Sequence, residues 1–281
     1  MLPLVIAAVS CQQKGDKVPA LDTSYMDLSI SPKSDFYSYA NGNWVKNNPL
    51  KPEYARFGSF DKLREDNVER LNALFAEMSK MSPAYGTNDQ KIVDLYKQGL
   101  DSTRLNSEGA TPIVKDLNAI YAAADKQELV KVLADMNKYG TGGFFGVGVD
   151  ADLMDSDSQV LYMGQGGLGM GDRDYYVAKE NAELHEKYQQ MIEKFFSLCG
   201  LDEPARRAAR ALKTEDALAE FSWTSIQNRD DTTLYNPMST SQIAATFKGF
   251  DFALFFKSLG LPEQEKVIVQ QPSFFNGFAK L

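Results

Sequence analysis

The chain has 281 residues, of which 43% are hydrophobic and 24% charged, which is typical of a globular protein with one large domain or two small ones. Its formal net charge of −8 argues against nucleic acid as a partner, because phosphate binding depends on clustered Lys and Arg. Two cysteines, Cys11 and Cys199, are too few for a disulfide framework.

The first eleven residues predict a secretory signal with a lipid attachment site. Met1–Ser10 is an apolar run, too short to span a bilayer, that ends in small residues. Ala8-Val9-Ser10-Cys11 resembles a bacterial lipobox, in which the cysteine is lipidated after cleavage. We therefore expect an exported lipoprotein of the bacterial cell envelope, periplasmic or on the outer surface, with Cys11 as its membrane anchor. No Lys or Arg precedes the run, so a fortuitous apolar N-terminus is the alternative.

Residues 12–34 are polar, contain Pro and Gly, and predict a flexible tether. The next stretch, Asp35–Arg64, contains three Tyr, three Phe, one Trp, two Gly and two Pro. Ordinary helices and linkers lack this composition, so residues 35–60 predict a compact N-terminal segment. Arg56 is its one exposed basic residue and precedes an amphipathic helix that begins near Phe60.

Apolar residues at helical spacing predict a mainly α fold for the rest of the chain, with a helical domain over 61–281. Two apolar stretches, 144–149 and 159–163, flank a polar connector and predict a small β-hairpin near residues 144–163. Further helices are expected at 111–121, 126–139, 179–198, 202–221, 239–247 and 250–259. Three Phe fall within the last eight residues, which predicts a domain that is incomplete at its C-terminus.

His185 is the only histidine of the chain. With Glu186 it begins the zinc motif H-E-x-x-H, but Gln189 stands where the second His is required. Because two imidazoles one helical turn apart must face the ion, no zinc site of this type can form here. We therefore predict no metal site, catalytic residue or cofactor within this chain, and a solvent-facing His185.

Two other motifs are weaker than they look. Gly164, Gly166 and Gly169 match the dinucleotide fingerprint G-x-G-x-x-G, but residues 172–176 intervene where a helix would have to begin. A tight loop that lets backbone segments pack closely is predicted instead. The aspartates of residues 150–157 lack the Gly that a calcium loop needs, so they predict a solvated hairpin connector, with adventitious cation binding as the alternative.

Arg56 is the candidate binding residue. A guanidinium held between aromatic side chains can bind a carboxylate through two parallel hydrogen bonds, and Phe57 and Phe60 follow it closely. Asp61 and Arg64, on the helix that follows, could hold it in place. The alternative is an arginine that is tied into a structural ion pair.

Several long segments resemble neprilysin-type zinc metallopeptidases, a family that includes endothelin-converting enzymes and bacterial oligopeptidase O. The likeness covers about residues 35–281. It is carried by DFYSYANGNWVKNNPLKPEYARFGSFDKLRE, QKIVDLYKQGLDSTRLNSEGATPI, LYMGQGGLGMGDRDYY, Arg229-Asp230-Asp231 and Leu234-Tyr235-Asn236-Pro237-Met238. Members of this family have two mostly helical lobes around a chamber. One lobe holds zinc through H-E-x-x-H and a downstream Glu, and the other caps the chamber and admits only short peptides.

The resemblance implies that this chain is the cap lobe of a metalloendopeptidase that hydrolyses short peptides. Zinc and the catalytic half are then expected outside the chain, so no activity is expected from it alone. Arg56 matches the family's arginine that binds the terminal carboxylate of a peptide, flanked by Asp61 and Arg64. Animal members have a Cys where Asn41 stands, which fits a bacterial origin. A stand-alone, non-catalytic peptide-binding lipoprotein is the alternative function.

Overall fold

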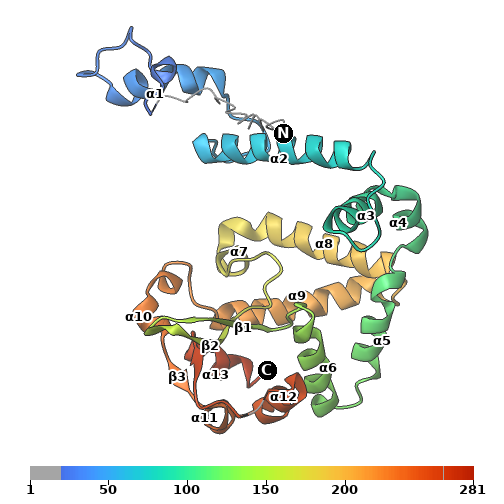
Figure 1. Cartoon of the computed structure of the whole chain (residues 1–281). Helices are drawn as coiled ribbons and strands as arrows, with labels where there is room; N and C mark the ends of the chain where they lie inside the picture. Colours follow the sequence, from blue (N-terminus) through green and yellow to red (C-terminus); the bar gives the residue numbers. More distant parts are fainter. Residues whose placement is uncertain (1–19, 262) are drawn as a thin grey trace, which may run out of the picture. The chain divides into compact units, whose positions relative to one another are not determined.

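The computed structural model describes residues 20–261 and 263–281. Cys11, the predicted signal and the first part of the predicted tether lie outside these residues. The described chain is mostly helical with one small sheet, which confirms the mainly α prediction. It divides into two compact units, an N-terminal unit up to Asp101 and a C-terminal unit over Ser102–Leu281 (Figure 1). The domain limits predicted from the sequence stay a prediction.

The N-terminal unit is built from helices. They are η1 (Thr23–Tyr25), α1 (Phe36–Asn47), α2 (Ser59–Met78) and α3 (Asn88–Leu100). The aromatic stretch that we expected not to be an ordinary helix thus contains a regular one, α1. Its start is set by Asp35, whose Oδ1 accepts a hydrogen bond from the Ser38 amide at 3.0 Å.

Asp27 fixes the segment before α1 to that helix. Its amide donates to the Tyr39 carbonyl at 2.9 Å, and Lys46 Nζ lies 2.7 Å from Asp27 Oδ2. Hydrogen bonds from Lys46 and then Ser29 lower the pKa of Asp27 to about 2. A Cβ at Gly42 would lie 2.8 Å from Asp27 Cβ, so this glycine permits the close approach. Hydrogen bonds to α1 therefore begin before Asp35, within the segment that was predicted to be a flexible tether.

The C-terminal unit contains most of the helices, and the ones predicted from the sequence are present within a few residues. None of the described helices is long and apolar enough to cross a membrane. The elements are α4 (Ser102–Glu108), η2 (Thr111–Ile113), α5 (Val114–Ala122), α6 (Lys126–Lys138), α7 (Asp174–Val177), η3 (Lys179–Asn181), α8 (Ala182–Leu198), α9 (Pro204–Phe221), η4 (Gln227–Arg229), α10 (Asp231–Leu234), α11 (Thr240–Thr246), α12 (Phe252–Leu259) and α13 (Pro272–Phe278).

The predicted hairpin is present as β1 (Phe145–Asp152) and β2 (Asp155–Gln165), which pair antiparallel. Its connector consists only of Leu153 and Met154, so the aspartates of residues 150–157 lie on the two strands. The prediction of a longer polar connector was therefore wrong. Polar side chains on a solvated strand do not interrupt its backbone pairing. The sheet continues with β4 (Val267–Val269), parallel to β2, and then β3 (Pro237–Met238), in the order β1-β2-β4-β3.

One cluster of aromatic rings forms the core of the C-terminal unit. Phe145 lies at its centre and packs against residues from α12, α13 and the segment before α12. The three Phe near the end of the chain, Phe274, Phe275 and Phe278, are all buried in this same core. The ring centroids within 5.8 Å of Phe145 belong to Phe250, Phe252, Phe255, Phe275 and Phe278.

A buried carboxylate joins the tip of the hairpin to β4. The Asp152 side chain is 2% exposed and is bonded to Lys266 Nζ. Its Oδ1 also accepts from the Tyr235 hydroxyl at 2.9 Å and from the Met154 amide at 3.0 Å. The hydrogen bond from Lys266 is the main cause that lowers the pKa of Asp152, and the same bond raises the pKa of Lys266.

Asp152→Asn is expected to lower the stability of the C-terminal unit at neutral pH. Because the folded-state pKa of Asp152 lies below its ordinary value of 3.8, its stabilisation is present above that value and is lost as the pH falls through the folded pKa. The difference in melting temperature between wild type and variant should therefore narrow on acidification from about pH 7 to about pH 3. Asp157→Asn, an exposed carboxylate on β2, is the control and should show no such narrowing. A pH-independent difference would contradict the assignment.

Candidate functional site

The loop that carries Arg56 runs from the end of α1 to the start of α2 and is held by aromatic rings. The Trp44 and Phe57 rings stack with centroids 6.2 Å apart. The Tyr54 ring meets Phe57 edge-on at 5.3 Å. Rings from both ends of the loop therefore pin its backbone around Arg56.

A polar contact fixes the same loop to α2. Lys51 Nζ lies 2.7 Å from Glu65 Oε1, and the Tyr54 hydroxyl donates to the same oxygen at 3.1 Å. The hydrogen bond with Lys51 lowers the pKa of Glu65 and raises the pKa of Lys51. Both groups are thus charged at neutral pH. Among the residues that the structure describes, Lys51 of this loop has an acidic partner and Arg56 has none.

Arg56 is exposed, as the sequence predicted. Within residues 20–261 and 263–281, no hydrogen bond or ion pair joins its guanidinium to another residue, so the alternative of a structural ion pair is not what these residues show. Asp61 Oδ2 accepts from the Gly58 amide at 2.9 Å and so caps α2. Arg64 Nη2 lies 3.3 Å from Asp61 Oδ1. Asp61 and Arg64 therefore pair with each other and shape the turn after Arg56, and neither forms a described hydrogen bond or ion pair with its guanidinium.

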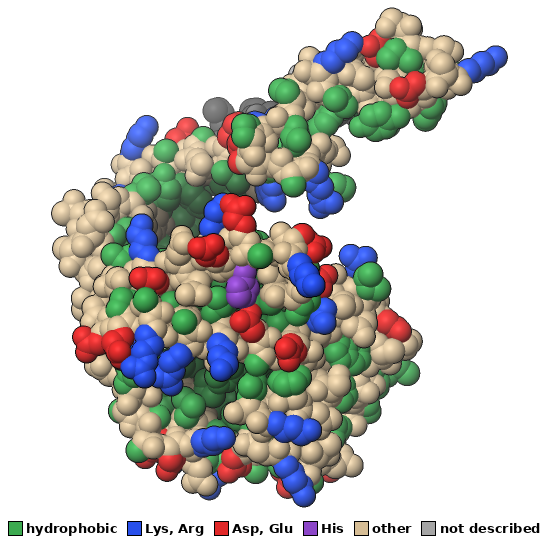
Figure 2. All heavy atoms as spheres, turned by 180° about the vertical axis from the view of Figure 1, so that it is seen from behind, with side chains coloured by type: hydrophobic (Ala, Val, Ile, Leu, Met, Phe, Trp, Pro, Cys, Tyr) green, Lys and Arg blue, Asp and Glu red, His purple; other side chains and the backbone are tan. Residues whose placement is uncertain are grey.

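His185 is more constrained than predicted. Its Nε2 lies 2.7 Å from Asp216 Oδ1, and its side chain is only 28% exposed. The Tyr176 ring meets the imidazole edge-on at 6.1 Å. His185 thus lies on a helix at the surface, as predicted, but it also pairs with Asp216, because α9 places an acid beside α8 that the sequence of α8 does not reveal. Figure 2 shows the histidine (purple) at the surface with acidic side chains beside it.

The glycine-rich loop after β2 packs closely, as predicted. A Cβ at Gly167 would lie 3.0 Å from the Phe144 Cα, and one at Gly166 would lie 3.2 Å from the Phe145 Cα. The Gly169 amide donates to Glu215 Oε2 at 3.0 Å. The loop therefore packs closely against the neighbouring backbone and does not form a phosphate-binding site, because its Gly169 amide already donates to a carboxylate.

Glu215 on α9 joins this loop to its neighbours through several hydrogen bonds, and the sequence did not predict this role. Besides the Gly169 amide it accepts hydrogen bonds from the Tyr176 hydroxyl at 2.5 Å and the Tyr188 hydroxyl at 3.1 Å. Burial and the charge of Glu215 raise the pKa of Tyr188 to about 12, and burial with the Glu215 bond raises the pKa of Tyr176. No local pattern marks Glu215, since its partners lie on other elements.

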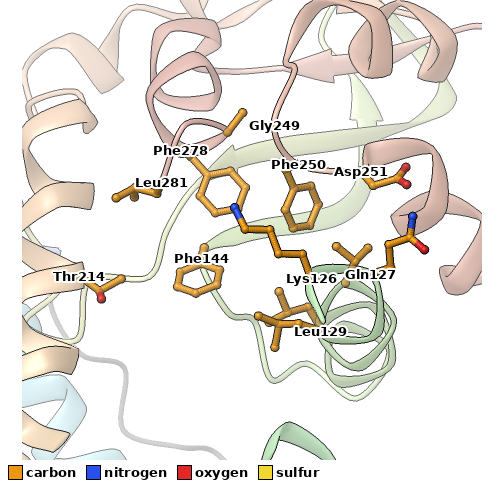
Figure 3. Close-up of a pocket in the computed structure, with 13 residues that line it drawn as sticks. Lys126, Gln127, Leu129, Phe144, Thr214, Gly249, Phe250, Asp251, Phe278 and Leu281 are labelled. Carbon is orange, nitrogen blue, oxygen red and sulfur yellow. The ribbon is translucent and has the colours of Figure 1, made fainter. Parts of the chain in front are cut away.

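One cavity in the C-terminal unit lies between α6, the turn before α12 and the end of α13, and has a volume of about 430 Å³. Its wall is mostly apolar, with Leu129, Phe144, Phe250 and Phe278 around it and Lys126 at its side (Figure 3). Part of its lining belongs to the core cluster, and none of the candidate site residues lines it.

Comparison with known proteins identifies the family of this chain. The sequence model of peptidase family M13 matches residues 32–281. The chain belongs to peptidase family M13. It is similar to human endothelin-converting enzyme 1, with 27% identity over 274 residues, or 92% of this chain and 35% of that protein.

Solved structures agree with the assignment to M13. The zinc metalloprotease ZMP1 of Mycobacterium tuberculosis, in complex with an inhibitor, matches with a TM-score of 0.82 and 30% identity, over 93% of this chain and 40% of that one. PepO from Lactobacillus rhamnosis matches with a TM-score of 0.71 and 20% identity, over 89% of this chain and 40% of that one, and shows the fold alone. The M13 chain thus spans about two fifths of the structures it matches.

These M13 relatives confirm the resemblance to neprilysin-type metallopeptidases and the assignment to their N-terminal region. A zinc ion is implied by the family, but the residues of this chain that the structure describes do not fit one. The imidazole of His185 is bonded to Asp216, and Gln189 stands one turn further along α8. Among the described residues, no group of three or more His, Cys, Asp or Glu is placed to hold a metal.

Proposed function

We propose that this M13 chain supplies the peptide-binding cap of a zinc metallopeptidase that hydrolyses short peptides. The single observation that carries the proposal is the match of residues 32–281 to the family. The chain spans 35% of human endothelin-converting enzyme 1, so the activity is proposed for the whole protein. Zinc and the groups that activate water are proposed to lie in the catalytic half outside this chain, because His185 is its only histidine.

The purified 281-residue chain is expected to bind no stoichiometric zinc and to cleave no peptide. Zinc per chain can be measured by elemental analysis after dialysis, and cleavage can be followed with quenched fluorescent peptides. An intact M13 enzyme under the same conditions is the positive control. Chelator-sensitive cleavage by the pure chain would show that it holds a complete site, and the proposal would then be wrong.

We propose that Arg56 binds the terminal carboxylate of the peptide. The pinned loop, the exposure of Arg56 and the lack of an assigned partner among the described residues support this role. Asp61 and Arg64 are proposed to support Arg56 indirectly, since their pair and the Gly58 cap fix the turn that follows it. A guanidinium with its donors unoccupied can form a bidentate pair with a carboxylate.

Arg56→Ala, made in the intact enzyme, is expected to weaken binding of peptides with a free C-terminus by about ten- to a hundredfold, the effect of losing a charge-assisted hydrogen-bond pair. Amidated peptides should lose much less, because they present no carboxylate. Peptide inhibitors in free-acid and amide forms provide the comparison through their inhibition constants. Arg70→Ala, which removes an exposed arginine further along α2, is the matched control. Equal losses for acid and amide would refute the role of Arg56.

The apolar face of α2 supports a docking partner for the N-terminal unit. Phe60 is 87% exposed, Leu63 61% and Leu74 48%, and Val68 and Leu71 continue the same stripe. An amphipathic helix gains most of its stability by burying such a stripe. We therefore propose that α2 packs against the catalytic half of the enzyme.

We further propose that the protein is exported and anchored in the bacterial cell envelope through a lipid on Cys11. The support is the lipobox-like sequence Ala8-Val9-Ser10-Cys11. An anchor of this kind would place the peptidase where it meets peptides outside the cytoplasm.

A further inference from the structure

The two edges of the sheet differ in how well they are protected from other strands. The strand order places β3 at one edge and β1 at the other. β3 is only two residues long and begins with Pro237, which has no amide hydrogen to offer. β1 is eight residues long and contains neither Pro nor Lys. Natural sheets usually blunt their edges with such residues, so β1 is the edge able to accept another strand.

The hydrogen bonds show which backbone groups of β1 point outward. The Met163 carbonyl on β2 accepts from the Gln270 amide, beyond β4, at 2.9 Å and so points away from β1. Met163 pairs with Val147, so this pair is not hydrogen-bonded, and pairs alternate along an antiparallel ladder. The amides and carbonyls of Val147 and Val149 therefore face the outer edge. The Ala151 amide agrees, because it donates to Asp150 Oδ1 at 2.8 Å.

This outer edge is accessible. Val149 is 67% exposed, and Gly146 and Gly148 are exposed. In the part of the chain that the structure describes, no backbone hydrogen bond outside the hairpin involves Val147 or Val149. A Cβ at Gly148 would meet no atom within 4 Å, so the face beside the edge is open as well.

The charge of the chain indicates which kind of partner strand could pair with the outer edge of β1. Asp150 on β1 is exposed, and so are Asp155 and Asp157 on β2 near the tip of the hairpin. The whole chain carries a net charge of −8, so a second copy of it would be repelled. A peptide with basic side chains would be attracted, and strand addition gives affinity through main-chain hydrogen bonds.

We propose that β1 binds an extended, basic peptide segment by strand addition to the backbone of Val147 and Val149. The site is distinct from Arg56 and recognises no terminal carboxylate. It rests on the proposed function only in that its ligand is a peptide. Basic side chains of the peptide lie near Asp150, while its amides and carbonyls pair with the free edge.

The test uses the full chain and a fluorescent peptide of alternating Lys and Val that is blocked at both ends. Binding is measured by fluorescence anisotropy at low and high salt. We expect saturable binding that weakens with salt, and at least about tenfold weaker binding when Glu replaces Lys or when the amides along one edge of the peptide are N-methylated. Equal binding of the N-methylated peptide would overturn strand addition without any change to the protein.

Two variants locate the site. Val149→Pro removes an outward amide hydrogen and leaves the β2 ladder intact, so it should weaken binding by about three- to tenfold. Val149→Ala keeps the amide and should bind within about twofold of wild type. Equal weakening by both, or a chain that forms dimers dissociated by Val149→Pro, would overturn the proposal. Failure here leaves the Arg56 role standing, because the blocked peptide has no carboxylate and the Arg56 comparison uses the intact enzyme.

Discussion

Phe145→Ala is expected to lower the free energy of unfolding of the C-terminal unit by about 3–5 kcal/mol, the usual cost of truncating a buried Phe. Phe145 is 3% exposed and lies at the centre of the aromatic core. Five other rings have centroids between 5.1 and 5.8 Å from its own, most of them edge-on. Truncation therefore removes both buried area and ring contacts, and leaves a cavity that a rigid cluster fills poorly.

Chemical denaturation followed by circular dichroism measures this loss. Phe195→Ala is the matched control, because Phe195 lies on α8 and is 55% exposed. The control should change the free energy of unfolding by less than about 1 kcal/mol. A similar change for both variants would mean that Phe145 is not the centre of the core.

Gly249→Ala is expected to destabilise the same unit by about 2–5 kcal/mol, because backbone strain and steric overlap add. Gly249 has φ of +121°, a conformation that residues with a Cβ rarely adopt. A Cβ there would lie 1.9 Å from the Ala279 carbonyl oxygen, which is backbone and cannot rotate away. The turn before α12 and the end of α13 would have to separate.

Gly260→Ala measures the cost of backbone strain at a positive φ without the steric overlap that Gly249→Ala adds. Gly260 has φ of +78° and caps α12, but a Cβ there would meet no atom within 4 Å. Its cost should be only about 1 kcal/mol. Melting temperatures of the two variants provide the comparison. If Gly260→Ala were as damaging as Gly249→Ala, the overlap with Ala279 would not be the cause.

Local patterns were sufficient to predict most helices and the hairpin. The apolar stripe in residues 126–139 and the helical pattern of residues 202–221 are properties of adjacent residues, and they reappear as α6 and α9. The helix α1 was missed because its aromatic and glycine content hides the helical period, while Asp35, an N-cap, was present to reveal it. Strands β3 and β4 were missed because two or three residues carry no period.

The binding site proposed around Arg56 divides in the same way. Arg56 and its exposure follow from the sequence, because the turn and the aromatic residues around it are local. The contacts of its neighbours could not be predicted from the sequence. In the structure, Asp61 caps α2 and pairs with Arg64. Glu215 lies 46 residues from the Gly169 amide that it binds, so only the packing of α9 against the loop brings them together.

By itself, the sequence determined the family, the mainly helical class and the lack of an H-E-x-x-H motif, because each depends on residue identity and short-range order. Only the tertiary structure decided that Phe145 forms the centre of the core, that Asp216 binds His185, and that no described strand pairs with the outer edge of β1. The physical reason is that burial, ion pairing and strand pairing join residues distant along the chain, and no local pattern records which partners will meet.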